Sequence, residues 1–464
     1  MARRPNVVMM VADDHRMGAI RAQGDPTVQT PTFDRLMAEG ASFDQTYISG
    51  AFYGAVCAPS RASILTGNSV FSSTISCEVD TPRASETINP DLVMLPEAFR
   101  AAGYHTHAIG KWHNDPVSLN RAFASGSRLF FGGMSDHTAV PLRDYDPSGA
   151  YPAEAVTIGD GFSSEIFADA AIEFLDHAGD EPFFLYVAFT APHDPRTPPE
   201  PFASRYAAAD MPLPPNAWPQ HPFDNGELRN RDERLAAMPR DPDEVRQHIA
   251  DYYGMISHLD AQVGRILDAL DAQGLAEDTI VVYTADHGLA VGQHGLMGKQ
   301  NLYQHSIRVP LLMRGRGLPA GARVDRMTAN IDTFPTLCAL AGVAVPATVE
   351  GQTLLPLLAS GEGGYDERFA AYRDVQRMVT DGRWKLIRYA VSGKTGEGVD
   401  AWQLFDLATD PWELDDRSGD ESLHAERDRL FSRLAAWQRR VGDALVLPQA
   451  SIPAVTLGQD RHPA

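Results

Sequence analysis

Acidic and imidazole side chains follow two apolar runs that lie far apart in the sequence. Asp13 and Asp14 come directly after residues 7–12, and Asp286 and His287 come just after residues 280–284. Carboxylates that meet at one point repel one another unless a cation lies between them. Oxygen-rich ligands favour a hard ion such as Ca²⁺ or Mg²⁺. A lone Asp pair commonly just ends a strand, but the second acidic strand end makes metal binding the better hypothesis.

Four basic side chains could bind an anion beside such a metal. Lys111 and His113 follow the apolar run 106–110, His193 follows the run 183–189, and Lys299 comes later in the chain. Each alone has a structural explanation, such as a lysine whose stem covers apolar surface. Together, the lysines could neutralise a bound anion while the histidines move protons near neutral pH.

Cys57 opens the segment Cys57-Ala58-Pro59-Ser60-Arg61, which predicts the start of a helix with proline in its first turn. The free N–H groups and positive dipole end of a helix start suit an anion next to residue 57. A free cysteine is more often a small buried hydrophobic residue. Three widely spaced cysteines indicate neither a disulfide framework nor a zinc site. To packing or the surface we assign Cys77, Cys338, His105, His107 and His258.

The elements that position these residues are predicted by continuous apolar runs, which are typical of strands buried on both faces of a mostly parallel sheet. The runs are residues 7–12, 106–110, 183–189 and 280–284. Their polar ends should gather at the carboxyl edge of the sheet, where open α/β sheets build their sites. Amphipathic patterns predict helices at 31–39, 163–179 and 245–274. This alternation predicts an α/β sandwich.

Two regions depart from the alternation. Residues 114–160 are rich in loop signals, and residues 194–242 hold eleven prolines, which exclude long regular elements. Because this proline-rich insertion follows His193, we predict a lid over the site. After residue 360, a hairpin over 377–389 with a turn at Asp381-Gly382 and a helix near 421–441 predict a second unit. We therefore expect a catalytic domain over 1–360 and a small antiparallel subdomain over 361–464.

Composition excludes several classes of partner. The 464 residues include 61 acidic and 40 basic side chains, a formal charge of -21, so we expect no nucleic acid partner. No run approaches the roughly 18 apolar residues of a membrane span, and the first residues form no signal peptide. We expect a cytoplasmic protein without a membrane partner, or a periplasmic one if a signal segment has been removed. Its oligomeric state stays open.

Five segments resemble those of one enzyme family. The run from Cys57 to Gly67 resembles the maturation signal of type I sulfatases, and the run from Gly103 to His113 resembles their second signature. The segments 191–193, 286–288 and 298–303 are also similar to family segments and follow in the family's order. The resemblance spans about residues 5 to 390. It implies an alkaline-phosphatase-like fold, with a large α/β domain and a small C-terminal sheet.

The resemblance also implies a cofactor and a modification. In this family a formylglycine-generating enzyme oxidises the cysteine at the position of Cys57 to formylglycine, whose hydrated aldehyde is the nucleophile. The divalent ion is usually Ca²⁺, with Mg²⁺ and Mn²⁺ as alternatives, and its implied ligands are Asp13, Asp14, Asp286, His287 and residue 57. Arg61 would orient the hydrate, while Lys111 and Lys299 would bind sulfate oxygens. His113 would act as the base that expels sulfate, and His193 would protonate the leaving alcohol.

The activity implied is hydrolysis of a sulfate monoester, on a small molecule or an oligosaccharide, with a sulfated sugar preferred. The alternative is a phosphonate monoester or phosphodiester hydrolase, favoured by His287 because many sulfatases have Asn there. A metal-binding homologue whose Cys57 is never oxidised is a third reading. We assign His294 to loop structure. Candidates for contacting the leaving group are Asp136, His137, Arg143, Arg196 and Arg373.

Overall fold

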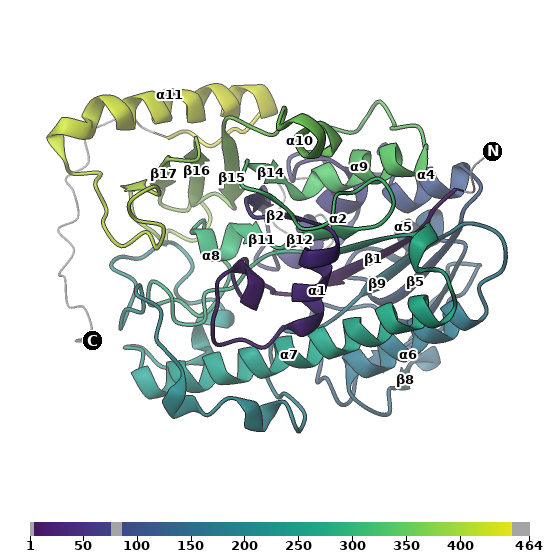
Figure 1. The fold of residues 1–464 in the computed structure, drawn as a ribbon. Helices are drawn as coiled ribbons and strands as arrows, with labels where there is room; N and C mark the ends of the chain where they lie inside the picture. Colours follow the sequence, from purple (N-terminus) through teal and green to yellow (C-terminus); the bar gives the residue numbers. More distant parts are fainter. Residues whose placement is uncertain (1–3, 76–85, 448–464) are drawn as a thin grey trace.

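A computed structural model of the chain describes residues 4–75 and 86–447 (Figure 1). Cys77, which we assigned to packing or the surface, lies outside the described residues. The fold is built on an eight-stranded sheet in the order β13-β2-β12-β10-β1-β9-β5-β6. Its strands are β1 (Asn6–Ala12), β2 (Ala41–Phe43), β5 (His105–Lys111), β6 (Ser125–Phe130), β9 (Phe183–Ala188), β10 (Thr279–Ala285), β12 (Leu311–Arg314) and β13 (Ala322–Val324).

The four predicted strands are confirmed as the centre of this sheet. β10, β1, β9 and β5 lie side by side and run parallel, with Met9 paired to Val282 on one side and to Tyr186 on the other. β12 runs antiparallel to both β10 and β2. Because the four central strands are parallel, their carboxyl ends open at the same edge, as the sequence predicts.

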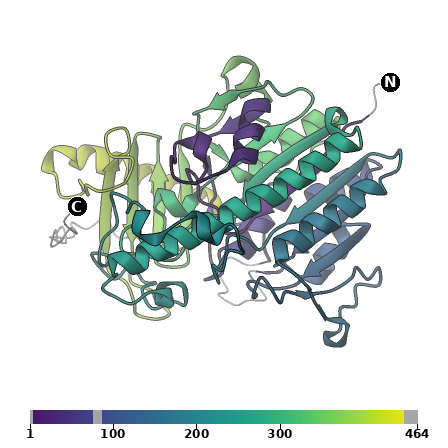
Figure 2. The same cartoon turned by 60° about the horizontal axis from the view of Figure 1, so that its bottom comes forward.

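Helices cover both faces of the sheet, as Figures 1 and 2 show. Alternate residues of β1 point to opposite faces: Val8 and Met10 belong to one apolar core, Val7 and Met9 to the other. The first core is completed by α1 (Pro31–Glu39), α6 (Ser163–Asp176) and α7 (Pro242–Ala272). The second is completed by α2 (Cys57–Thr66), α4 (Leu95–Ala101), α5 (Pro116–Ala122), α9 (Thr333–Ala341) and α10 (Leu355–Ser360).

The three predicted helices are α1, α6 and α7, and the last of these begins earlier than its apolar pattern. Pro242 occupies its first turn, and the Asp241 side chain caps it by accepting from the N–H groups of Asp243 and Glu244. The apolar pattern starts only at Val245, so periodicity misses this turn. In the described part of the chain, none of the helices is both long and apolar enough to cross a membrane.

Short elements complete the large domain. A three-stranded sheet joins β3 (Thr46–Tyr47), β11 (Arg308–Val309) and β14 (Thr328–Ala329), and a two-stranded one joins β7 (Pro141–Leu142) and β8 (Thr157–Ile158). α8 (Gln304–Ile307) precedes β11. The proline-rich insertion holds only short 3-10 turns among its described elements, at Ala203–Arg205, Ala208–Asp210 and Asp232–Leu235.

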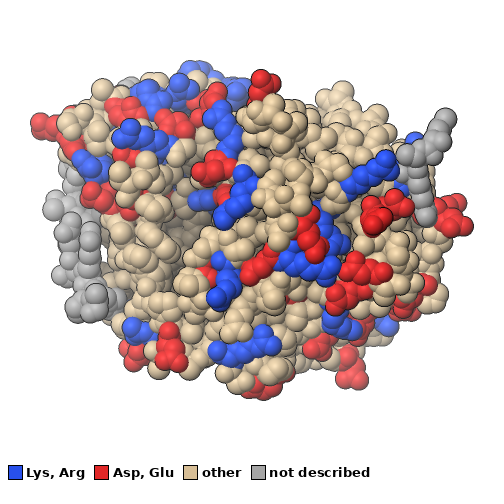
Figure 3. Space-filling view, viewed as in Figure 1, with Lys and Arg blue, Asp and Glu red and all other residues tan. Residues whose placement is uncertain are grey.

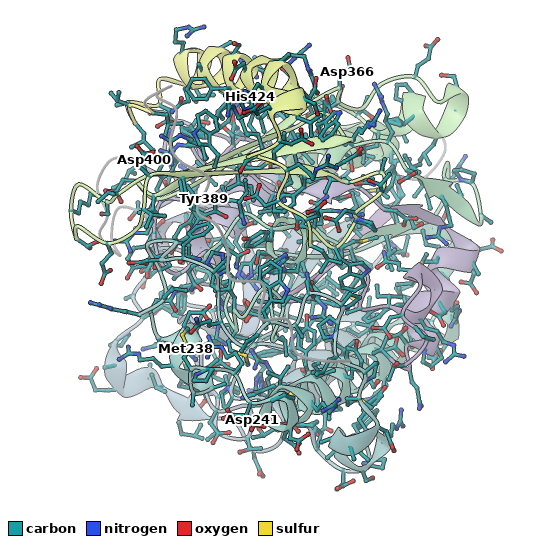
Figure 4. The ribbon with its side chains drawn as sticks, turned by 90° about the vertical axis from the view of Figure 1, so that its left-hand side faces the viewer. Met238, Asp241, Asp366, Tyr389, Asp400 and His424 are labelled. Carbon is teal, nitrogen blue, oxygen red and sulfur yellow. The ribbon has the colours of Figure 1, made fainter. Side chains whose placement is uncertain are left out.

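A smaller sheet forms the C-terminal part, in the order β18-β17-β16-β15-β4. Its strands are β15 (Arg368–Tyr372), β16 (Gln376–Thr380), β17 (Trp384–Tyr389), β18 (Ala401–Asp406) and β4 (Gly50–Ala51), and α11 (His424–Val441) packs on it through Trp437. The predicted hairpin is confirmed as the antiparallel pair β16 and β17. In Figure 4, Tyr389 of β17 lies between His424 at the start of α11 and Asp241 before α7.

The smaller sheet takes its edge strand from a distant part of the chain. β4, residues 50–51, pairs in parallel with β15, so residues close to Cys57 are part of the C-terminal sheet. The division of domains at residue 360 stays a prediction, since the sheet crosses it in this way. A two-residue strand carries no periodicity, so the sequence gives no sign of it.

Buried histidines predict an acid-sensitive fold. Burial lowers the pKa of His15 and His221 to about 4, from the usual 6.5. Between about pH 4 and pH 6.5 these histidines are protonated in the unfolded chain but neutral in the folded protein. The free energy of unfolding therefore rises with pH across this range. We expect each of these histidines to lower the free energy of unfolding by about 3 kcal/mol at pH 4 relative to pH 7.

Thermal unfolding of the wild type and of His221→Asn, measured between pH 4 and pH 8, checks this expectation. The melting temperature of the variant should fall less steeply on acidification, because one proton-binding group is gone. His105→Asn, on the exposed start of β5, is the matched control and should keep the wild-type slope. Identical slopes for all three proteins would contradict the prediction.

Candidate active site

The predicted site residues meet where three strands and one helix end or begin. Asp13 and Asp14 follow β1, Lys111 is the last residue of β5, and Asp286 follows β10. Cys57 is the first residue of α2, as the proline at position 59 predicts. All five are at most 2% exposed, so these charged groups interact at low effective dielectric, where charge pairs are strong.

The backbone at the end of β1 is fixed by contacts with β10 and α7. Asp14 has a φ of 71°, in the left-handed region that side chains other than glycine rarely adopt. Its N–H donates to Asp286 Oδ1 at 3.2 Å, and its carbonyl accepts from the Tyr252 hydroxyl at 2.6 Å. Conformations of this kind persist where surrounding contacts hold them, and they cluster at functional sites.

The acidic cluster fits a cation. One potential ligand atom from each of Asp13, Asp14, Cys57 and His287 lies within 4.8 Å of the others. Asp13 Oδ1, Asp14 Oδ2 and His287 Nε2 are buried without a hydrogen-bond partner. His287 Nδ1 lies 3.0 Å from the Gly288 carbonyl; if Nδ1 carries the proton and donates there, the lone pair of Nε2 is free for a metal.

Asp286 stands beside this cluster with both oxygens engaged. Its Oδ2 accepts from Arg61 Nε at 2.9 Å, and its Oδ1 accepts from the backbone N–H groups of Asp14 and His287. His287 Nε2 is 3.6 Å from the same Oδ1. The structure thus brings all five predicted ligands together. The potential ligand atoms that have no hydrogen-bond partner belong to Asp13, Asp14 and His287.

Two buried lysines pair with the carboxylates. Lys111 Nζ forms an ion pair with Asp13 and donates to the Gly133 carbonyl. Lys299 Nζ donates to Asp14 Oδ1 at 2.8 Å and lies 3.7 Å from Cys57 Sγ. Although burial opposes the charge, the neighbouring Asp14 raises the pKa of Lys299 well above its ordinary value. Lys299 is therefore a fixed cation next to residue 57.

The carboxylates are charged in turn. Burial favours the neutral acid, but Lys111 and His193 hold the pKa of Asp13 well below its usual value. His193 and Lys299 likewise lower the pKa of Asp14. Burial dominates at Asp286 and raises its pKa. Asp13 and Asp14, whose pKa values are lowered, therefore lie in one cluster with His287, whose Nδ1 is 3.2 Å from Asp14 Oδ1.

The two histidines predicted to move protons lie at the pocket in their neutral forms. Burial lowers the pKa of His193 to about 4, and burial together with Lys111 lowers the pKa of His113 well below its usual value. His193 Nδ1 lies 2.8 Å from the Asp194 carbonyl, and its Nε2 is 3.8 Å from Asp14 Oδ2. Gly133 presses against His113, since a Cβ there would lie 2.8 Å from the ring.

Cys57 is poorly suited to act as a thiol. Burial and the nearby Asp13 raise the pKa of its thiol to about 12. The thiolate is the nucleophilic form of cysteine, so at neutral pH the side chain is almost entirely the unreactive thiol. Sulfur is also a soft ligand, whereas the surrounding carboxylates suit a hard ion.

Above these residues lies a pocket of about 430 Å³. Cys57, His113, His193 and Lys299 line it. Gln300 belongs to the predicted segment 298–303, but sequence reasoning missed other lining residues that have no recognisable motif around them: Tyr53, Glu86, Met134, Asn230, Arg231 and Asp232. Residues 230–232 belong to the proline-rich insertion, which therefore borders the pocket. That it opens and closes as a lid stays a prediction.

Of the five leaving-group candidates, Arg373 lines this pocket and is paired with Glu227 at 2.7 Å. The other four lie outside the described lining: Asp136 is exposed, His137 is bonded to the His193 carbonyl, Arg143 lies over the Phe131 ring, and Arg196 lies beside His248. His294 stacks on Tyr303 with ring centroids 3.8 Å apart and contacts the Glu413 carbonyl. It is also outside the lining.

The remaining histidines and Cys338 also lie away from the pocket. Ser125 Oγ is 2.7 Å from a ring nitrogen of each of His105 and His107, at the opposite end of β5. His258 is buried in α7, with Nε2 3.1 Å from Glu165 Oε1, and Cys338 is buried in α9.

Comparison with known protein families identifies the family to which the chain belongs. The model of the sulfatase family matches residues 5–343, which is most of the chain. The chain belongs to the sulfatase family. A second model, the C-terminal region of N-sulphoglucosamine sulphohydrolase, matches residues 292–440. The predicted family is confirmed, and the chain is a sulfatase-family enzyme.

Two curated relatives cover almost the whole chain. It is 27% identical to an N-acetylglucosamine-6-O-sulfatase of Bacteroides thetaiotaomicron, over 95% of this chain and 87% of the relative. It is also 27% identical to the multifunctional alkaline phosphatase superfamily protein PehA of Trinickia caryophylli, over 97% of this chain and 98% of the relative.

Solved structures confirm the alkaline-phosphatase-like fold. A protein in complex with its substrate D-glucosamine-2-N,6-O-disulfate superposes with a TM-score of 0.78 at 24% identity, over 95% of this chain and 99% of that one. A phosphonate monoester hydrolase of Agrobacterium radiobacter gives a TM-score of 0.74 at 25% identity, over 94% and 96%.

Proposed function

We propose that this enzyme hydrolyses sulfate monoesters through a formylglycine formed from Cys57 and a divalent cation held beside it. The observation that carries the proposal is the ring of buried basic side chains around residue 57. Lys299 Nζ lies 3.7 Å from its sulfur, Lys111 pairs with Asp13, and Arg61 pairs with Asp286. A cysteine acting alone would need none of these groups.

The charge balance supports an anionic substrate. Asp13, Asp14 and Asp286 face Lys111, Lys299 and Arg61, so three carboxylates and three cations offset one another. A divalent cation on the acidic cluster would leave a positive surplus. Buried charge without a partner is costly, and the anionic group of a sulfate ester would compensate for it. The molecule as a whole is strongly acidic, so the attraction is local.

The cation would be held by Asp13, Asp14, His287 and residue 57, with Asp286 alongside. Ca²⁺ suits the carboxylate oxygens, and Mg²⁺ and Mn²⁺ are the alternatives. When bound, it would polarise an oxygen of the ester and stabilise the charge that develops there. The formylglycine would supply, as its hydrate, the nucleophilic hydroxyl that the Cys57 thiol lacks.

The basic side chains have distinct roles in this proposal. Lys111 and Lys299 bind the sulfate oxygens, and their positions are fixed in advance by Asp13 and Asp14, which favours charge stabilisation without reorganisation. Arg61, held by Asp286, orients the hydroxyl groups at residue 57. Neutral His113 takes the proton that must leave when sulfate is released. His193 delivers a proton to the departing alcohol from Nε2, with Lys299 beside it, once the bound anion favours its charged form.

Cys57 must be modified before the site is complete. The side chain is only 2% exposed, so a formylglycine-generating enzyme could not reach it in the folded protein. We therefore infer that the modifying enzyme acts on the chain before α2 is buried. Mass spectrometry of the peptide that contains position 57 measures the degree of conversion directly.

A sulfated sugar is the preferred substrate class. The pocket of 430 Å³ suits a single sugar ring, and its rim offers the hydrogen-bonding side chains of Tyr53, Glu86 and Asn230. The N-acetylglucosamine-6-O-sulfatase of B. thetaiotaomicron, similar over almost the whole chain, supports this choice.

The second candidate function is hydrolysis of phosphonate monoesters or phosphodiesters at the same site. His287 favours it, because a neutral imidazole replaces the amide that many sulfatases have there. The likeness to PehA and to the phosphonate monoester hydrolase of A. radiobacter points the same way.

Initial rates on 4-nitrophenyl sulfate and on a matched 4-nitrophenyl phosphodiester decide between the two candidates, with Cys57→Ala as the control. A dominant sulfate rate that depends on Cys57 supports the sulfatase. A dominant diester rate assigns the enzyme to the second candidate, and His287→Asn should then shift the ratio towards sulfate. Rates that are independent of Cys57 would refute both.

Replacing His193 should slow the hydrolysis of esters with poor leaving groups far more than that of esters with good ones. For His193→Asn we expect kcat/KM on an alkyl sugar sulfate to fall by about 10²–10⁴-fold, the usual contribution of a general acid. The loss on 4-nitrophenyl sulfate should stay below about tenfold, because a nitrophenolate leaves without a proton. His105→Asn is the remote control. Equal losses on both substrates would show that His193 does not protonate the leaving group.

A further inference from the structure

A second pocket, which we call the Trp412 pocket, lies apart from the catalytic pocket. It has a volume of about 520 Å³ and is enclosed by residues 16–18, 23–27 and 212–215, by α7, by the start of α8 and by Trp412. The described linings of the two pockets share no residue. In Figure 3, a recess with a largely uncharged surface opens left of centre, where α8 and its neighbouring loops lie in Figure 1. The volume suits a small ligand.

Several buried polar atoms in the Trp412 pocket have no hydrogen-bond partner among the described residues. His305 is only 6% exposed, and neither of its ring nitrogens has a hydrogen-bond partner. The same holds for Gln304 Oε1 and Gln23 Nε2. Buried polar groups are normally satisfied, because leaving them unpaired costs free energy. The burial of His305 keeps its ring neutral, so it can donate one hydrogen bond and accept another.

The charges in the pocket favour an anion. Arg16 is 8% exposed and Arg308 is half-buried, and neither forms an ion pair with a carboxylate of the described residues. Arg308 Nη2 donates to the Asp44 backbone carbonyl. Arg16 donates to the Ala290 carbonyl at 3.3 Å, and Arg308 Nε is unpaired. Asp25 is the one carboxylate in the described lining. It accepts from the Tyr253 hydroxyl and from the Thr27 N–H, so its charge is already engaged.

The pocket also offers aromatic surface. Trp412 is 42% exposed, which is unusual for a tryptophan outside a binding surface. Prolines 26, 214 and 411 extend the apolar wall. A flat indole can stack against the apolar face of a sugar ring, while neighbouring polar side chains form hydrogen bonds with the hydroxyl groups of the sugar.

We propose that the Trp412 pocket binds an anionic sugar, with its ring against Trp412 and its sulfate or carboxylate group at Arg308 and Arg16. His305 and Gln304 would satisfy the hydroxyl groups. Arg16 is two residues from Asp14, and Gln304 is five residues from Lys299, so two of the chain segments that form this pocket also lead into the catalytic site. The inference concerns binding alone and does not depend on the proposed turnover.

Tryptophan fluorescence of the full-length Cys57→Ala protein, which should not turn over substrate, tests the proposal. The probes are N-acetylglucosamine 6-sulfate, glucuronic acid and neutral N-acetylglucosamine. We expect at least one of the two anionic sugars to change the fluorescence through Trp412, so that Trp412→Leu loses the signal and Trp384→Leu keeps it. Arg308→Gln should weaken the affinity by about tenfold, the value of one charge-assisted hydrogen bond. The sulfate and carboxylate probes show which anion is preferred.

Two results would overturn the proposal. The first is equal affinity for the neutral sugar and the anionic ones. The second is a signal that survives in both Trp412→Leu and Arg308→Gln but disappears in Lys299→Ala, since it would come from the catalytic pocket. If Trp412→Leu does not fold, calorimetric titration of Arg308→Gln against the parent protein answers the same question. Absence of sulfatase activity in the wild type would leave these binding results unaffected.

Discussion

Replacing Cys57 by alanine should reduce kcat on 4-nitrophenyl sulfate by about 10⁴–10⁶-fold, the range found when a nucleophile is removed from an enzyme that keeps the rest of its site. The physical reason is that the surrounding groups only position and neutralise the ester. Lys299, Lys111 and Arg61 are fixed by Asp14, Asp13 and Asp286, and none of these groups is placed to attack sulfur. Steady-state rates on purified protein measure the loss.

Alanine is close in size to the cysteine, and Cys57 is buried at the start of α2. The variant should therefore fold like the wild type and still bind metal through Asp13, Asp14 and His287, which circular dichroism and calcium titration verify. Cys57→Ser sharpens the test, because a serine has one hydroxyl where the aldehyde hydrate has two. It should release at most one equivalent of nitrophenol and then stop. Wild-type turnover by Cys57→Ala would exclude residue 57 as the nucleophile.

The sequence predicts the central sheet because its strands are long and apolar on both faces. β1, β9 and β10 are buried along their whole length, and such runs leave a clear mark in the chain. Once those strands are parallel and adjacent, the positions of Asp13, Lys111 and Asp286 follow from topology alone. This is why residues far apart in sequence could be placed together without knowledge of their contacts.

Many of the other residues that line the pocket lie outside the long helices and strands, in segments without a periodic apolar pattern. Asp232 is an example: it lies in the proline-rich insertion and has no motif around it. In the fold it is buried, and Lys299 and His193 overcome that burial and lower its pKa to about 2. Glu86 lines the pocket from another part of the chain, with Oε1 3.8 Å from His113 Nε2. Tertiary contact alone brings these residues to the site, so a single sequence does not reveal them.

The structure also adds a constraint on the metal that spacing did not give. The sequence predicts five ligands, but both oxygens of Asp286 accept hydrogen bonds, from Arg61 and from two backbone N–H groups. Asp286 therefore links the arginine to the end of β1 as well as adjoining the acidic cluster. Asp13 differs, because Oδ2 pairs with Lys111 while Oδ1 is buried without a hydrogen-bond partner, 3.9 Å from Arg61 Nη2. The variant that isolates metal binding is thus Asp13→Asn.

Asp13→Asn should weaken Ca²⁺ binding by at least about 100-fold, since even outer-shell changes cost about 10–100-fold in metal affinity. The amide keeps the shape of the side chain but loses the charge that attracts the ion. We expect kcat on 4-nitrophenyl sulfate to fall by about 10²–10³-fold at limiting metal, the cost of losing one charge-stabilising group. Calorimetric titration of chelator-treated protein with Ca²⁺ and Mn²⁺ measures the affinity without reference to activity. Asp136→Asn, which removes an exposed carboxylate, is the matched control. Unchanged metal affinity in Asp13→Asn would remove this residue from the ligand set and assign its charge to positioning Lys111 alone.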